Sequence, residues 1–160
     1  MMQRHAPNPA LLCDRHWTVL DATPSARVLL AGLQGDSSDT NVVRMLATSP
    51  LAAQGIANYP EVLQEMAGRI RLEALEAGAD PVLAEHLRAL EEVMRLHPAS
   101  GAAQRRPLAP IILRSPTGDL SFLSTIAHFG TSEDVTVRDL RLELLFPVDD
   151  ATRQAMAALG

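Results

Sequence analysis

Apolar residues recur at two different spacings along the chain, and the two spacings predict strands in some segments and helices in others. Two short β-prone runs open the sequence, and beyond residue 107 apolar and polar residues alternate, which is typical of strands. Between them, apolar residues recur every third or fourth position, as on amphipathic helices. The chain is therefore expected to run strands, helices, strands. Strands are expected at 10–14, 17–21, 108–114, 119–129 and 135–146, and helices at 23–33, 41–48, 58–78, 80–97 and from Asp149 or Asp150 onward.

Local start and stop signals define the helices. Thr23-Pro24 and Asp80-Pro81 each offer a capping side chain followed by a first-turn proline. Asn58 with Glu61 has the form of a capping box, and the second helix is expected to end before Pro50. The two long helices, joined by residues 77–80, should pack as an antiparallel pair.

The last strand indicates how the sheet is buried. Leu140, Leu142, Leu144 and Phe146 alternate with Asp139, Arg141 and Glu143, so we expect the leucine face to be the buried one. The predicted fold is α+β and PAS-like, with a five-stranded antiparallel sheet covered on one face by about four helices. Residues 8–160 should form this one domain after a linker or disordered segment at 1–7. Residues 99–107 are expected to be a flexible linker and 130–134 a turn.

Composition narrows the class of protein. The chain has 160 residues, 47% of them apolar, and a net charge of −5, which is unsuited to gripping nucleic acid. All 14 basic residues are arginine, so Schiff-base lysine chemistry is excluded. No secretory leader or membrane-spanning run is apparent, and Cys13 has no cysteine partner, so a reducing, cytoplasmic location is expected.

Motifs that carry catalysis are missing from the sequence. It contains no HExxH, GxSxG, phosphate loop or CxxC, and no spaced pair of acids opposite a histidine. Cys13 is expected to be a small buried hydrophobe, since no base can be assigned to it. We therefore expect no enzyme, no catalytic residue, no metal site and no cofactor.

Several residues could line a binding pocket, and each also has a purely structural interpretation. His128 shares a strand face with Phe122 and Ile126, where it could bond a ligand head group or, less readily, haem iron; alternatively it lies at the strand end or on the outer face. Trp17 could wall a pocket or plug the end of the sheet. The apolar stripes of the two long helices, which include Met66 and Ile70 on the first and Leu87 and Met94 on the second, could be core or pocket lining.

Three arginine features are also ambiguous. Arg69 and Arg71 flank Ile70 and could anchor a carboxylate, although solvated helix faces are the simpler interpretation. The pair Arg105-Arg106 could touch a partner, but so short a basic run is usually solvated.

The chain resembles the ligand-binding domain of MmyB-like regulators in several stretches. Residues 8–22 are similar to its opening, in which a strand, a basic turn ending in Trp and a second strand lead into a helix. Residues 41–46 match more weakly, whereas 118–131 running into 134–147 are the most specific. The resemblance implies a PAS-like fold and a pocket for a small apolar ligand such as a fatty acid. The side chains expected to line it are Trp17, Met66, Ile70, Leu87, Phe122, Ile126, His128, Leu142 and Leu144.

The sequence departs from the family pattern at three places. Thr23 stands where the family often has Asn, and Glu61-Val62 where it often has Glu-Trp. Loss of a Trp near the pocket would change the pocket volume, so ligand identity does not carry over. The family normally carries a helix-turn-helix domain ahead of this one, whereas only seven residues precede Asn8. Either the sequence is part of a longer regulator or a free-standing sensor exists.

Three functions compete at this stage. A sensor would bind an apolar ligand, shift between two packings and so change a dimer or an attached DNA-binding domain. A purely structural dimerisation domain would have a fully packed interior, and an enzyme would need catalytic groups that the sequence does not offer. Sequence favours the homodimeric sensor, which would reach DNA only through the missing helix-turn-helix domain; an internal cavity would distinguish it from the structural domain.

Overall fold

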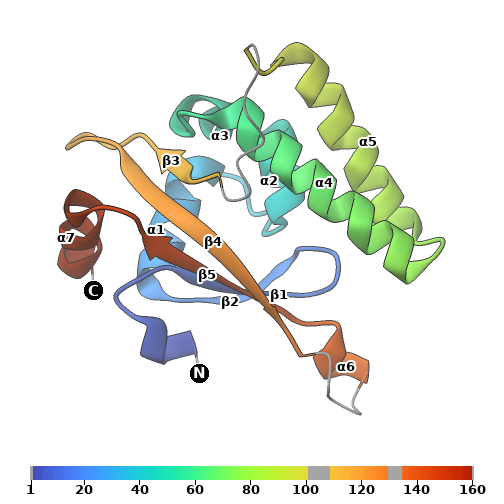
Figure 1. Cartoon of the computed structure of the whole chain (residues 1–160), viewed down its shortest axis with the longest axis horizontal. Coiled ribbons are helices and arrows are strands. Elements are labelled where there is room, and N and C mark those ends of the chain that lie inside the picture. The colour runs from blue at the N-terminus through green and yellow to red at the C-terminus, as the bar shows by residue number, and fades with distance from the viewer. Residues whose placement is uncertain (1, 101–108, 130–134, 160) are drawn as a thin grey trace.

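The computed structural model describes residues 2–100, 109–129 and 135–159 and has an α+β fold (Figure 1). Its sheet has the strand order β2-β1-β5-β4-β3, with every neighbouring pair antiparallel. The fold class predicted from the sequence is confirmed. The elements are η1 (Met2–His5), β1 (Ala10–Cys13), β2 (Val19–Ala22), α1 (Pro24–Gln34), α2 (Val42–Thr48), α3 (Pro50–Gly55), α4 (Tyr59–Ala77), α5 (Pro81–Leu96), β3 (Ile111–Leu113), β4 (Leu120–His128), α6 (Val135–Arg138), β5 (Arg141–Pro147) and α7 (Asp150–Leu159).

Helices α2 to α5 gather on one side of the sheet, and α4 and α5 form the expected antiparallel pair (Figure 1). Asn41, Ser49 and Asp80 cap α2, α3 and α5 through their side chains. Pro50 has two effects, because it ends α2 and also occupies the first turn of α3. Helix α3 is not among the elements expected from the sequence.

Both edges of the sheet are bordered by other parts of the chain. At β2, Thr18 forms an isolated bridge with Asn41, and at β3 Leu113 forms one with Ile56. The expected capping box at Asn58 is not formed: its side-chain amide donates to Pro110 O (2.7 Å) and its oxygen accepts from Ile112 N (3.0 Å). Asn58 thus fastens the start of α4 to β3, and these contacts shield edges that would otherwise invite strand pairing.

The structure differs from the prediction in two segments, the start of the last strand and the N-terminal linker. The expected strand at 135–146 begins only at Arg141, because β5 pairs with β4 as far as His128 and with β1 as far as Cys13; residues 135–138 are helical instead. The expected linker at 1–7 includes η1, whose His5 Nε2 donates to Leu145 O (3.0 Å) and whose ring packs edge-on against Phe146. Most of the predicted linker at 99–107 and the whole turn at 130–134 lie outside the described residues.

Strand register shows which side chains face the helices. Phe122, Ile126 and His128 share a face of β4, as predicted. Because paired residues of neighbouring strands lie on the same face, Glu143 and Arg141 of β5, which pair with Ile126 and His128, share it as well. Phe122 belongs to the main core, so this is the face that the helices cover. Leu142 and Leu144 pair with Ala127 and Thr125 and lie on the opposite face. The leucine face of β5 therefore points away from the helices, contrary to the expectation, although Leu142 on that face is itself buried (4% exposed). Arg141 and Glu143 face the helices because α4 supplies charged partners for them.

Candidate functional site

The turn between β1 and β2 places Trp17 in the interior, under α4. Trp17 has a φ of 67°, a left-handed conformation that a bulky side chain rarely adopts. Its side chain is fully buried, and its indole N–H donates to Glu73 Oε2 on α4 (2.9 Å). Such backbone strain persists only where the surroundings impose it, and it is concentrated at functional sites.

Around Trp17 lies a largely buried ionic cluster of Glu73, Arg141, Arg69 and Glu143, in which Arg69 is the most exposed side chain at 24%. Arg141 Nε contacts Glu73 Oε1 at 3.0 Å, and their side chains are only 13% and 9% exposed. Arg69 lies over the Trp17 ring, 5.8 Å from its centroid, and 3.9 Å from Glu143 Oε1. Buried ion pairs contribute little net stability because desolvation offsets their attraction. A cluster of this kind is therefore a candidate for function as well as for structure.

The same turn is tied to the start of α5. Asp80 Oδ2 contacts Arg15 Nη2 (2.8 Å) and His16 Nε2 (3.0 Å), and His86 Nε2 donates to His16 O (3.0 Å). Burial would raise the pKa of Asp80, but hydrogen bonds from His16 and from the backbone N–H groups of the α5 cap bring it down to about 2. Burial lowers the pKa of His86, so this ring favours its neutral form.

A small pocket of about 210 Å³, the mouth pocket, opens beside the cluster. The Glu73–Arg141 pair forms part of its wall, so the pocket leads from solvent to the group that bonds the Trp17 indole. Its lining residues are Arg15, Glu73, Glu76, Ala77, Leu83, Asp139 and Arg141. Most of the lining side chains are charged, and Leu83 is the lining residue that also belongs to the buried core.

The structure brings most of the predicted pocket residues together. Trp17, Met66, Ile70 and Phe122 belong to one buried cluster, against which Leu87 and Ile126 pack. His128 is exposed at the end of β4, and Leu142 and Leu144 lie on the other face of the sheet. The first six therefore belong to one core or pack against it, whereas the last three are separate from it.

Sequence reasoning missed the charged members of the site. Glu73 lies three residues after Ile70 on the apolar stripe of α4, and Arg141 and Glu143 alternate with leucines in β5. A carboxylate on an apolar helical stripe, together with two charges on one strand face, was the available signal. Arg69, weighed as a carboxylate anchor or a solvated residue, binds Glu65 (3.2 Å) and lies beside Glu143. Arg71 is exposed and pairs with Glu91.

Metal and nucleophile chemistry find little support in the described part of the chain. No group of three or more His, Cys, Asp or Glu side chains there could hold a metal ion. Cys13 is buried, and desolvation raises the pKa of its thiol to about 12, which keeps it protonated and unreactive. None of the helices over these residues is long and apolar enough to cross a membrane.

One family of known proteins matches the chain. The family model described as the MmyB-like transcription regulator ligand binding domain matches residues 1–159. Comparison with curated proteins and with solved structures gave no significant match.

Proposed function

The chain belongs to the MmyB-like transcription regulator ligand binding domain family, and we propose that it senses a small apolar molecule, such as a fatty acid, held between its sheet and α4. The observation that carries this proposal is that two lining residues connect the mouth pocket to the core: Glu73 accepts from the Trp17 indole, and Leu83 belongs to the same buried cluster as Trp17, Met66, Ile70 and Phe122. A ligand with one polar end and an apolar tail would match a polar pocket beside an apolar core.

The polar end of the ligand would lie in the mouth pocket. Arg15 and Arg141 line it and carry N–H donors suited to a carboxylate. The carboxylate of the ligand would take the place of Glu73 as the hydrogen-bond partner of Arg141. The tail would lie among Met66, Ile70 and Phe122. Because these side chains are already buried, α4 must move away from the sheet when the ligand enters, and a ligand that binds only the opened state shifts the population toward it.

The opening of α4 would reach the rest of the domain through the Trp17 turn. That turn contacts α4 through Glu73 and α5 through Asp80, and Trp17 O accepts from Val42 N at the start of α2 (2.9 Å). We propose that the domain acts in the cytoplasm as a homodimer and controls DNA binding by a helix-turn-helix domain outside this chain. Light scattering that showed a monomer at high concentration would exclude the dimer.

A structural dimerisation domain without a ligand is the second candidate. The observation in its favour is that Trp17, Ile70 and Phe122 are completely buried, so the interior is closely packed. Ligand binding to the purified protein distinguishes the two candidates.

Trp17, the one tryptophan of the chain, provides the test. Native mass spectrometry and lipid extraction would first show whether an apolar molecule co-purifies. Palmitate brominated in mid-chain should then quench the fluorescence of Trp17 saturably, whereas unbrominated palmitate should compete without quenching. Absence of both co-purified lipid and quenching would favour the structural domain.

Matched arginine variants locate the head group. Arg141→Met should weaken palmitate binding about 10-fold, since a charge-assisted hydrogen bond contributes about 1.5–3 kcal/mol. Arg71→Met, which removes an exposed guanidinium from α4, should leave it unchanged. Equal effects of the two variants would contradict binding at the mouth pocket.

A further inference from the structure

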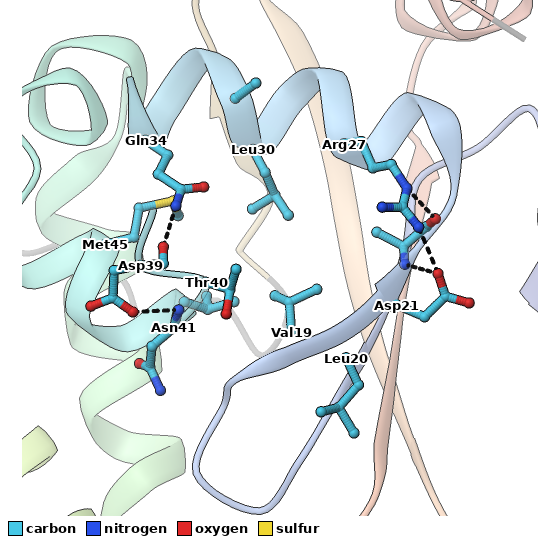
Figure 2. A pocket seen from close by; sticks show the side chains of 13 residues that line it. Val19, Leu20, Asp21, Arg27, Leu30, Gln34, Asp39, Thr40, Asn41 and Met45 are labelled. Carbon is cyan, nitrogen blue, oxygen red and sulfur yellow. Dashed lines mark hydrogen bonds and ion pairs between the residues drawn. The ribbon is translucent and has the colours of Figure 1, made fainter. Parts of the chain in front are cut away.

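A second and larger opening, the α1/β2 cleft, lies outside the proposed sensor site. It has a volume of about 370 Å³ and is bounded by β2, by α1 and by the segment that leads into α2 (Figure 2). It shares no lining residue with the mouth pocket. The cleft is lined by Val19, Leu20, Asp21, Ala22, Arg27, Leu30, Ala31, Gln34, Asp39, Thr40, Asn41, Val42 and Met45.

The middle of the cleft is apolar and its two ends are polar. Val19 of β2 lies below Leu30 of α1, while Gln34 and Arg27 project from the same helix at opposite ends (Figure 2). Since Gln34 and Arg27 lie about two turns apart on α1, a molecule that bridges them must be elongated. The volume is within the range of small-molecule sites.

Charges around the cleft are already neutralised. Arg27 Nη2 contacts Asp21 Oδ1 at 2.7 Å, and Arg44 Nε contacts Asp39 Oδ2 at 2.5 Å. These pairs are largely solvent-exposed, so they leave little field for a charged ligand. The lining therefore favours an uncharged molecule.

Backbone groups along β2 are engaged in a way that blocks an added peptide strand. Val19 N donates to Thr40 O (3.0 Å), Arg27 Nε donates to Ala22 O (3.1 Å) and Ala22 N donates to Asp21 Oδ1 (2.8 Å). A peptide that bound by strand addition would need such groups free. A small molecule that packs on side chains does not.

Hydrogen-bonding capacity remains at each end of the cleft. Arg27 uses Nε and Nη2 in its contacts, and Figure 2 shows its other nitrogen on the side nearer to Leu30. Gln34 donates through Nε2 to Ser37 O (2.8 Å) and to Asp39 O, and its amide oxygen points away from these bonds (Figure 2). The cleft thus offers a donor at the Arg27 end and an acceptor at the Gln34 end.

We propose that the α1/β2 cleft is a second binding site, for a small uncharged molecule with an apolar body. The ligand carries a hydrogen-bond acceptor at the Arg27 end and a donor at the Gln34 end. The site is separate from the fatty-acid site proposed above and does not depend on it.

Occupancy of the cleft is communicated to the Trp17 turn by Asn41. This residue lines the cleft, and its Nδ2 donates to His16 O (2.7 Å) while its Oδ1 caps α2 by accepting from Arg44 N (3.0 Å). A ligand that contacts Asn41 therefore perturbs the backbone beside Trp17, which makes the indole N–H a distant reporter of binding.

NMR titration of the ¹⁵N-labelled chain tests the proposal with 4-hydroxyacetophenone, which has a carbonyl acceptor, an aromatic body and a hydroxyl donor. Saturable shifts are expected at the amides of Val19, Leu30 and Thr40 and at the Trp17 indole. The anionic 4-hydroxybenzoate and 4-ethylphenol, which lacks the carbonyl acceptor, should each bind about 10-fold more weakly, a factor equivalent to about 1.4 kcal/mol. Tighter binding of the anion, or shifts restricted to α4 and β4, would overturn it.

Two tryptophan variants on α1 supply the matched control. Ala31→Trp places a bulky ring in the cleft and should abolish the shifts at Val19 and Thr40, whereas Val28→Trp, at a 52% exposed position outside the lining, should preserve them. Both positions are exposed, so neither change disturbs the core. Shifts that persist in Ala31→Trp, or no saturable shift in the unmodified chain, would refute the site. Palmitate plays no part in this test, so the two proposals fail separately.

Discussion

Replacement of Glu73 by Gln measures the energetic weight of the buried ionic cluster. Glu73 is 8% exposed and accepts from both Arg141 Nε (3.0 Å) and Trp17 Nε1 (2.9 Å). Gln keeps the shape and one acceptor but loses the charge, so Arg141 is left buried without a counter-charge. Removing one partner of a buried pair costs 3–5 kcal/mol, and we expect the lower end, about 3 kcal/mol, because an acceptor is retained.

Urea denaturation followed by the fluorescence of Trp17 supplies the measurement. A domain with about 5–15 kcal/mol of stability remains folded after this loss. The control is Glu76→Gln, an exposed change one turn later on α4, which should alter the free energy of unfolding by no more than about 0.5 kcal/mol. An unchanged urea m-value would show that the compactness of the two states is unaffected.

A double-mutant cycle with Arg141→Met separates the pair from its surroundings. Glu73→Gln and Arg141→Met together leave no buried charge of this pair uncompensated, so the double variant should be about 2 kcal/mol more stable than the sum of the single losses predicts. Strict additivity, or a loss below about 1 kcal/mol for Glu73→Gln, would refute the assignment of a tightly coupled buried pair.

Three further predictions concern groups that titrate. Burial lowers the pKa of His86 beneath its ordinary value of about 6.5, so the unfolded chain takes up the proton first and the free energy of unfolding should fall as the pH drops below that value. Urea titrations at pH 7 and pH 5 should show a smaller fall in the free energy of unfolding for His86→Gln than for the unmodified chain. Asp80, with a pKa of about 2, contributes stability above about pH 4 that is lost as the pH falls toward 2, so Asp80→Asn should flatten the acid limb of the stability curve. Cys13, with its pKa raised to about 12 by burial, should react with an aromatic disulfide reagent only as fast as the domain opens; rapid labelling of the native protein would contradict its burial.

The order of elements was predictable because each segment carries its own local signal. The stripe of α4, the Asp80-Pro81 start of α5 and the alternation of β4 are local patterns that tertiary contacts do not override. The α6 segment was missed because what decides it is not local, whereas α3 was missed because its local start signal coincides with the stop signal of α2. Strand β5 begins where its partner strands end, and Pro50 is both a stop and a start signal.

The core-facing side of β5 could not be predicted from its own pattern. Leucines on one face and charges on the other ordinarily place the leucines inward. Here Arg141 and Glu143 face inward because Glu73 and Arg69, distant in sequence, supply partners on α4. Alternation identifies which residues share a face, but the residues that cover that face are set by the assembled fold.

The left-handed backbone of Trp17 has a consequence for how relatives of this chain can diverge. A residue in this conformation survives only if its neighbours continue to impose it, and here its indole is bonded to Glu73, which is paired with Arg141. Loss of the indole would remove one of the two hydrogen-bond donors to Glu73, and loss of Glu73 would leave Arg141 largely buried without its carboxylate partner. A substitution at position 17, 73 or 141 is therefore expected to be tolerated only when the other two positions change with it, although the three lie in distant parts of the sequence.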